Sequence, residues 1–230
     1  MPYFFMDYYY IILVIPAMLL AVWAQVKVKS TYNKFSKVSN TKGITGAYAA
    51  QAVLTHYGIN DVRIEQVSGK LTDHYDPKAK VIRLSEGVYG SSTIAAVGIA
   101  CHEAGHAAQH AQDYAPIKIR NSLVPVCNIG SSLGIPLALI GYFLGFEPLI
   151  SIGLLLYAAI ALFQVVTLPV ELNASRRAMK VIDETGLLQD EEQSGAKKVL
   201  TAAAMTYIAS MLVAIANLLR LILRFNNRRN

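Results

Sequence analysis

The chain has 230 residues, of which 54% are hydrophobic and only 16% are charged. A soluble globular domain carries roughly 25% charged residues, and the shortfall here is concentrated in four stretches without Asp, Glu, Lys or Arg. These stretches are residues 8–26, 121–146, 148–170 and 199–219. Because a helix needs about 20 apolar residues to cross the hydrocarbon core, the sequence predicts a mainly α-helical membrane protein with about four transmembrane helices.

The basic residues near these spans predict an orientation. Under the positive-inside rule, the loops richer in Lys and Arg face the cytoplasm. Twelve Lys and Arg residues close to the spans lie in the segments 27–120 and 171–198, and four lie on the opposite side: Lys27, Lys29, Lys34, Lys37, Lys42, Lys118, Arg120, Arg176, Arg177, Lys180, Lys197 and Lys198, against Arg220, Arg224, Arg228 and Arg229. We therefore expect a multi-pass protein of the plasma membrane with both segments in the cytoplasm. The basic C-terminus does not fit this orientation, which leaves open whether the fourth stretch crosses fully.

The net charge and the cysteine count exclude two other classes. Juxtamembrane Lys and Arg beside anionic lipid account for the net charge of +6, so the lipid bilayer is an expected partner and nucleic acid is not. The two cysteines, Cys101 and Cys127, are too few for a disulfide framework. Both are expected to be packing residues.

Residues 30–120 form a polar segment between the first two spans. Residues 44–57 are typical of an amphipathic helix that ends at Gly58, and residues 62–67 alternate like a half-buried strand. Residues 71–75 and 81–85 flank the turn sequence DPKAK, which predicts a β-hairpin.

A further helix is expected from Ser91 or Ser92, which would cap it, to about Gln112. The α/β segment is too small for a rich core of its own. We therefore expect residues 171–198 to complete it, so that residues 1–230 make a single membrane-embedded domain.

The second predicted helix of this segment contains CHEAGHAAQH, in which His102, Glu103 and His106 form H-E-x-x-H. Helix positions i and i+4 lie on one face, so two imidazoles can bind one zinc ion. Zinc lowers the pKa of a bound water to near 7, and Glu103 can then take its proton as general base. The motif predicts zinc-dependent peptide hydrolysis with one zinc per chain. A surface helix with scattered histidines is the alternative.

A third ligand has to come from outside this motif. His110 lies roughly 12 Å along the helix axis from His102, too far to share the ion, so it is interpreted as a supporting or surface histidine. The extended pattern H-E-x-x-H-x-x-G-x-x-H fails, because Gln109 and Gln112 stand at its Gly and last His positions.

Glu171 is the expected third ligand. It is the first charged residue after the third apolar stretch, and a carboxylate at that depth is costly to leave unpaired. Pairing with Arg176 or Arg177 is the alternative interpretation, and Glu86 and Glu184 are competing ligands.

The chain resembles a known family in these residues. CHEAGHAAQH, a two-span hairpin, ELNASRRA and DHYDPKAKVIRLSEGVYGSSTIAAVGIACHEAGHA resemble the YugP-type family of membrane neutral zinc metallopeptidases over nearly the whole chain. A more distant similarity links the chain to heat-shock membrane proteases and CAAX prenyl proteases. The resemblance implies a small zincin-like catalytic segment, with His102, His106 and Glu171 on zinc and Glu103 as the base.

One position departs from the distant relatives. They carry Glu-x-x-x-Asp, in which the Asp orients a ligand histidine, but this chain has Ser175 there. Asn173 or Ser175 is expected to share that task.

The sequence thus predicts a membrane-bound zinc endopeptidase that cleaves polypeptides at the cytoplasmic face. The edge of strand 81–85 is expected to accept an extended substrate, and five residues are candidates for stabilising the oxyanion: His74, Tyr75, Tyr89, Arg176 and Arg177. Two alternatives stay open: an intramembrane zinc protease, and a non-enzymatic membrane protein whose structural zinc has four protein ligands. Substrate preference and oligomeric state stay unassigned.

Overall fold

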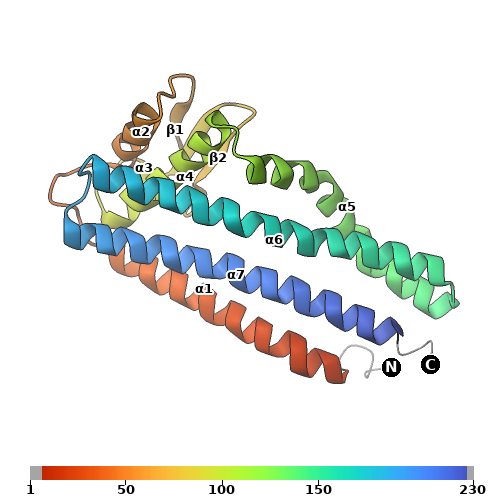
Figure 1. Ribbon diagram of the computed structural model, residues 1–230. Helices are drawn as coiled ribbons and strands as arrows, with labels where there is room; N and C mark the ends of the chain where they lie inside the picture. Colours follow the sequence, from red (N-terminus) through yellow and green to blue (C-terminus); the bar gives the residue numbers. More distant parts are fainter. Residues whose placement is uncertain (1–6, 227–230) are drawn as a thin grey trace. The chain divides into compact units, whose positions relative to one another are not determined.

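The computed structural model describes residues 7–226 (Figure 1). Its described part is mostly helical and contains one three-stranded sheet. In chain order the elements are a π-helical turn η2 (Tyr10–Val14), α1 (Ile15–Phe35), α2 (Gly46–His56), β1 (Arg63–Val67), β2 (His74–Asp76), β3 (Val81–Ser85), α3 (Glu86–Tyr89), α4 (Ile94–Ala111), α5 (Ala115–Leu144), α6 (Glu147–Glu184) and α7 (Asp190–Asn226).

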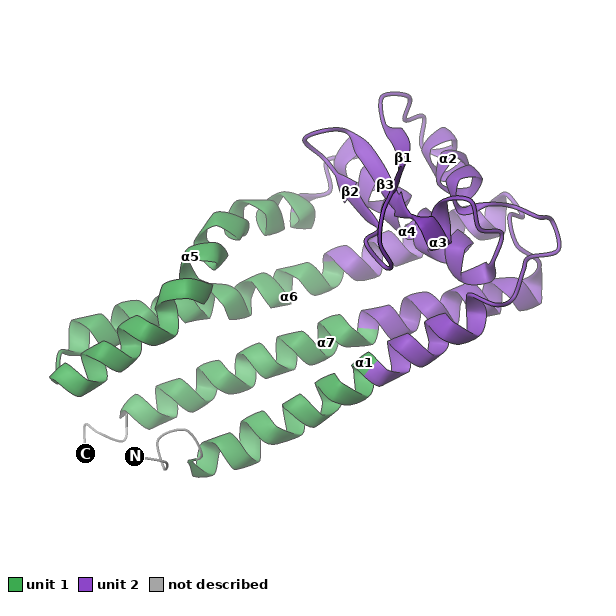
Figure 2. Cartoon of the chain, turned by 180° about the vertical axis from the view of Figure 1, so that it is seen from behind, with its two compact units in different colours: residues 1–25, 116–169, 205–230 green, residues 26–115, 170–204 purple. Residues whose placement is uncertain are grey.

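The chain divides into two compact units, which Figure 2 colours separately. Unit 1 comprises residues 1–25, 116–169 and 205–230, and unit 2 comprises residues 26–115 and 170–204. The predicted catalytic segment, residues 30–120 with 171–198, lies in unit 2 except for its last residues before the second span. That the whole chain is one metallopeptidase domain stays a prediction.

Four helices of the described chain are long and apolar enough to cross a membrane: Tyr10–Phe35, Ala115–Leu144, Glu147–Glu184 and Asp190–Phe225. This confirms the expected four apolar helices, and the fourth meets the same criteria as the others. Each helix is longer than the uncharged stretch that predicted it, because helical hydrogen bonding continues into polar sequence where the apolar stretch ends.

The surface of unit 1 is apolar. All the exposed large hydrophobic residues of the described chain belong to its residue ranges except Val26, Val38, Tyr48 and Leu71. Exposed apolar area on this scale marks a surface that is covered by another apolar medium. The helices of unit 1 therefore have the surface that a lipid bilayer requires.

Within unit 1, α5 and α6 form a tight helical hairpin. Gly145 has φ +68° at the turn, and Phe146 donates its N–H to the Gly141 carbonyl at 2.9 Å. A Cβ added at Gly153 would lie 2.5 Å from both Ala138 N and Gly134 O. Small residues thus let the two backbones approach closely, as is common between transmembrane helices.

An ion-pair cluster lies in unit 1. The Asp7 carboxylate lies 3.2 Å from both Arg220 Nη2 and Arg224 Nη1, and the Arg220 guanidinium lies 4.8 Å from the centroid of the Tyr10 ring. Two of the four basic residues that did not fit the predicted orientation therefore have an acidic partner. The other two, Arg228 and Arg229, lie outside the described residues.

Unit 2 contains the sheet, in the order β1-β3-β2. β2 and β3 form the predicted hairpin, although the first strand is His74–Asp76 and not residues 71–75. β1 pairs with the other side of β3 in parallel. β3 is therefore the central strand, and the expectation that its edge accepts a substrate is wrong, because both edges are already paired.

Two helices of unit 2, α2 and α4, each begin after a threonine that caps the helix. α2 begins after Thr45, whose side chain accepts from Tyr48 N. α4 is capped by Thr93, which accepts from Ala96 N at 3.3 Å; the expected caps Ser91 and Ser92 precede it. An Asx, Ser or Thr oxygen at this position satisfies one of the free N–H groups of the first turn.

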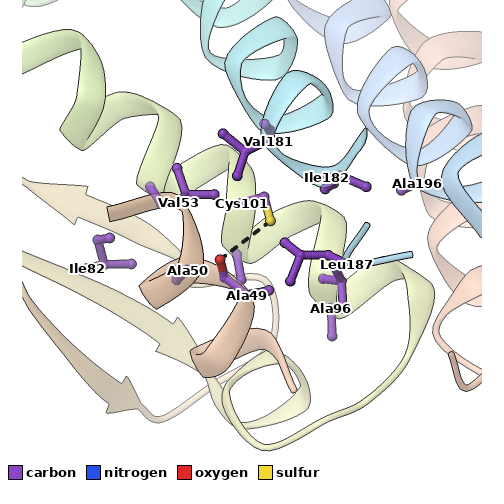
Figure 3. Close-up of a cluster of buried hydrophobic side chains, with 14 of the residues drawn as sticks. Ala49, Ala50, Val53, Ile82, Ala96, Cys101, Val181, Ile182, Leu187 and Ala196 are labelled. Carbon is purple, nitrogen blue, oxygen red and sulfur yellow. Dashed lines mark hydrogen bonds between the residues drawn. The ribbon is translucent and has the colours of Figure 1, made fainter. Parts of the chain in front are cut away.

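The core of unit 2 draws on both of its segments (Figure 3). Val53, Ile82 and Cys101 from the first segment pack with Val181 and Ile182 from the second. Burial raises the pKa of the Cys101 thiol, which donates to the Ala49 carbonyl at 3.8 Å. Cys101 is thus a packing residue, as predicted.

The close approach of α5 and α6 predicts a steric effect at Gly153. The change Gly153→Ala should destabilise the protein by about 1–3 kcal/mol, the usual range for overpacking, in reversible unfolding in mixed micelles. The control is Gly90→Ala, because an added Cβ there meets nothing within 4 Å and should change stability by less than about 0.5 kcal/mol. Equal stability of the two variants would contradict the packing described here.

Candidate metal centre

The first part of the site is the buried face of α4. Thr93 starts the helix, and an Ala-rich sequence carries it past both histidines without a break. His102 and His106 follow each other by one turn, with ring centroids 4.8 Å apart and planes at 84°. The helix therefore places two imidazoles side by side, as the spacing of four residues predicts.

The second part is the carboxylate of Glu171 on α6. Glu171 Oε2 lies 3.2 Å from His102 Nε2 and 3.5 Å from His106 Nε2. Two atoms that bind one tetrahedral zinc ion at roughly 2.0–2.1 Å lie about 3.3 Å apart. Among the described residues, these three side chains make a group that could hold a metal ion, because their ligand atoms all lie within 4.8 Å of one another.

The Glu171 carboxylate is buried and lies beside two imidazoles. Glu171 is 5% exposed, and a buried anion without a cationic partner costs several kcal/mol. Burial lowers the pKa of His106, but its hydrogen bond to Glu171 and the charges of Glu103 and Glu171 raise it more, so the pKa lies above the ordinary histidine value. The site is thus organised around negative charge that a cation can neutralise.

Neutral side chains contact the Nδ1 atoms of both histidines. Ser175 Oγ lies 3.1 Å from His102 Nδ1, and Gln109 Oε1 lies 3.0 Å from His106 Nδ1. These contacts leave both Nε2 atoms facing Glu171. The sequence suggested Asn173 or Ser175 for orienting a ligand histidine, and Ser175 makes a direct contact, to His102.

Gly105 lets α4 approach α6. A Cβ at this position would lie 2.6 Å from the Ala174 carbonyl oxygen, which is closer than any normal contact. Ala174 lies between Glu171 and Ser175 on α6, so the close approach brings both of these residues to the histidines.

The other residues considered from the sequence lie apart from this group. The His110 ring contacts Tyr75, with centroids 5.5 Å apart. Glu184 lies 3.5 Å from His56 Nε2 and 3.7 Å from Lys180 Nζ, and Glu86 is exposed at the start of α3.

The candidates for oxyanion stabilisation have different surroundings. Arg177 donates to Asn173 Oδ1 and Gln112 Oε1, so its guanidinium is already bound. Arg176 is exposed, and His74 Nδ1 lies 2.8 Å from the Thr72 carbonyl oxygen. The Tyr75 ring contacts His110 of α4, and Tyr89 packs against the hydrophobic core of unit 2.

Two residues of the site were missed in the sequence. In the sequence, Gln109 was considered only as a mismatch to a longer motif. Its position three residues after His106 nevertheless places it on the same helix face. Gly105 lies inside the motif at a position that accepts any residue. An uncharged polar residue on an otherwise Ala-rich face was the available signal for Gln109.

The comparisons with known proteins show the family of the chain. Residues 10–226 match the model of a family described as "Putative neutral zinc metallopeptidase". The chain belongs to this family. It is also 46% identical over 221 residues, 96% of this chain and 98% of the relative, to the "Putative membrane protease YugP" of Bacillus subtilis (strain 168). No solved structure matches it.

The family and the apolar helices together indicate what kind of protein this is. A zinc peptidase family implies zinc, and the group of His102, His106 and Glu171 fits that ion in ligand type and spacing. The membrane-protease relative and the four apolar helices indicate a multi-pass membrane protein.

The narrow contact at Gly105 gives a prediction about metal content. Gly105→Ala should push α6 away from α4 and lower the zinc retained per purified chain at least tenfold, measured by elemental analysis after dialysis. Gly98→Ala is the matched control on the same helix, because its Cβ would meet Ala196 Cβ at an ordinary 3.4 Å. Full zinc in Gly105→Ala would show that the close approach is not needed.

Proposed function

We propose that the protein is a membrane-bound zinc endopeptidase in which His102, His106 and Glu171 bind one zinc ion per chain. The observation that carries the proposal is the buried Glu171 carboxylate within 3.2 and 3.5 Å of two imidazole Nε2 atoms. Two histidines and a glutamate, with a position left for water, are a ligand set of zinc peptidases.

Glu103 is proposed as the general base. It follows His102 on α4 and is partly exposed, and it forms no hydrogen bond or ion pair with any residue that the structure describes. Zinc, when bound, polarises the substrate carbonyl and makes the attacking water more acidic. The Glu103 carboxylate then accepts the proton of that water and delivers it to the leaving amine.

Two observations weigh against the alternatives. α4 is not among the helices of residues 7–226 that are apolar enough to cross a membrane, which argues against a metal helix inside the bilayer. A structural zinc needs four protein ligands, whereas the described group offers three. The polar α/β segment that carries α4 supports a small zincin-like catalytic segment at the membrane surface.

The ligand and base roles predict separable losses. Glu103→Gln should retain one zinc per chain but lose cleavage of casein by at least 10²-fold, because the base is removed. Glu171→Gln should lose zinc as well. Zinc is measured on the purified protein in detergent, and cleavage is measured in parallel.

The matched control for both variants is Glu184→Gln, whose carboxylate pairs with His56 and Lys180. It should match the wild type in zinc and cleavage. Full zinc in Glu171→Gln would remove Glu171 from the ligand set, and full cleavage by Glu103→Gln would exclude it as the base.

We propose that the site faces the cytoplasm, as the basic residues near the spans predict, and this orientation predicts a labelling pattern. In a chain whose Cys101 and Cys127 are replaced by Ala, Tyr48→Cys in unit 2 should react with an impermeant maleimide only after permeabilisation. Leu144→Cys, at the turn between the second and third spans, should react in intact cells. Both parent side chains are well exposed, at 63% and 72%. The reverse pattern would place the site outside the cell.

A further inference from the structure

The Gln109 side chain is a fully buried polar group in contact with the proposed metal site. It is 0% exposed, and its three polar contacts are all made within unit 2. Oε1 lies 3.0 Å from His106 Nδ1, while Nε2 donates to the Val170 carbonyl at 2.7 Å and to Asn173 Oδ1 at 3.0 Å. A buried amide is costly unless its groups are bonded, and here both ends are.

Two anchors fix which way this amide points. The Val170 carbonyl oxygen can only accept a hydrogen bond, so the amide nitrogen of Gln109 must face it. Independently, Arg177 Nε donates to Asn173 Oδ1 at 2.8 Å, and a guanidinium has no acceptor. Asn173 therefore presents its oxygen, which again requires the Gln109 nitrogen.

The orientation of the amide determines the tautomer of His106. The Gln109 oxygen is left facing Nδ1, and an amide oxygen can only accept, so Nδ1 must carry a proton. A neutral imidazole with the proton on Nδ1 has its lone pair on Nε2. Nε2 is the atom that faces Glu171 at 3.5 Å.

We propose that Gln109 is a positioning residue that holds His106 in the Nδ1–H tautomer and presents its Nε2 lone pair to the metal. The inference rests on the proposed zinc site and adds a determinant of its affinity. Groups that orient metal-binding histidines in this way typically change metal affinity by about 10–100-fold when they are removed.

The anchoring extends beyond the three residues in direct contact. Arg177 is itself held by Gln112 Oε1 and lies over the rings of Tyr57 and Tyr114, at 5.5 and 6.0 Å from their centroids. The amide orientation thus depends on a network that joins α4 to α6. Ser175, which contacts the other histidine, has a hydroxyl that can donate or accept and imposes no such choice of tautomer.

Two variants separate positioning from packing. Gln109→Met keeps the approximate volume but removes the acceptor, so zinc affinity should fall about 10–100-fold in chelator competition. Gln109→Glu keeps an acceptor for Nδ1–H but loses the amide donors. It should bind zinc more tightly than Gln109→Met, because a carboxylate acceptor also orients the imidazole and raises its basicity, although the metal-free protein should unfold more readily, as Gln109→Met should.

The outcomes distinguish this inference from the proposed function. Gln109→Met with wild-type zinc affinity, or an equal loss in Gln109→Met and Gln109→Glu, would overturn the positioning role while the zinc site stands. A wild type that binds no zinc would instead remove the proposed function.

One readout needs no variant. In long-range proton–nitrogen NMR of ¹⁵N-histidine-labelled, zinc-loaded wild type, His106 should carry its proton on Nδ1. A zinc-bound His106 protonated on Nε2 would overturn the inference.

Discussion

The buried carboxylate of Glu171 has to be matched by positive charge, and the local structure around it follows from that requirement. α4 supplies two imidazoles at a spacing of one turn, within 3.2 and 3.5 Å of the carboxylate. Gly105 removes the side chain that would hold α4 and α6 apart. The two imidazoles, and a cation bound between them and the carboxylate, can supply that positive charge, and breaking such a buried pairing is strongly destabilising.

The groups that orient the two histidines are neutral, Ser175 on one side and Gln109 on the other. A carboxylate in these places would make the imidazoles more basic ligands. Here the negative charge near the site comes from Glu171 and from the proposed base Glu103. The hydrogen bonds at the Nδ1 atoms of the two imidazoles are therefore made by uncharged groups.

The sequence predicted those parts of the candidate site that depend on local spacing or on membrane depth. His102 and His106 were readable from the i, i+4 spacing, and Glu171 from its place after a long uncharged stretch. Gln109 was not readable, because its role depends on a carbonyl and an amide of α6. The central place of β3 was also missed, because its parallel partner β1 precedes the hairpin and nothing local specifies that pairing.

The most direct test of the account is the position of zinc in crystals of the wild-type protein, located by anomalous scattering at the zinc absorption edge. The account predicts one peak per chain, bound by His102 Nε2, His106 Nε2 and a Glu171 oxygen. A zinc peak with other ligands, or His102 and His106 bound to zinc while Glu171 pairs with an arginine, would contradict it.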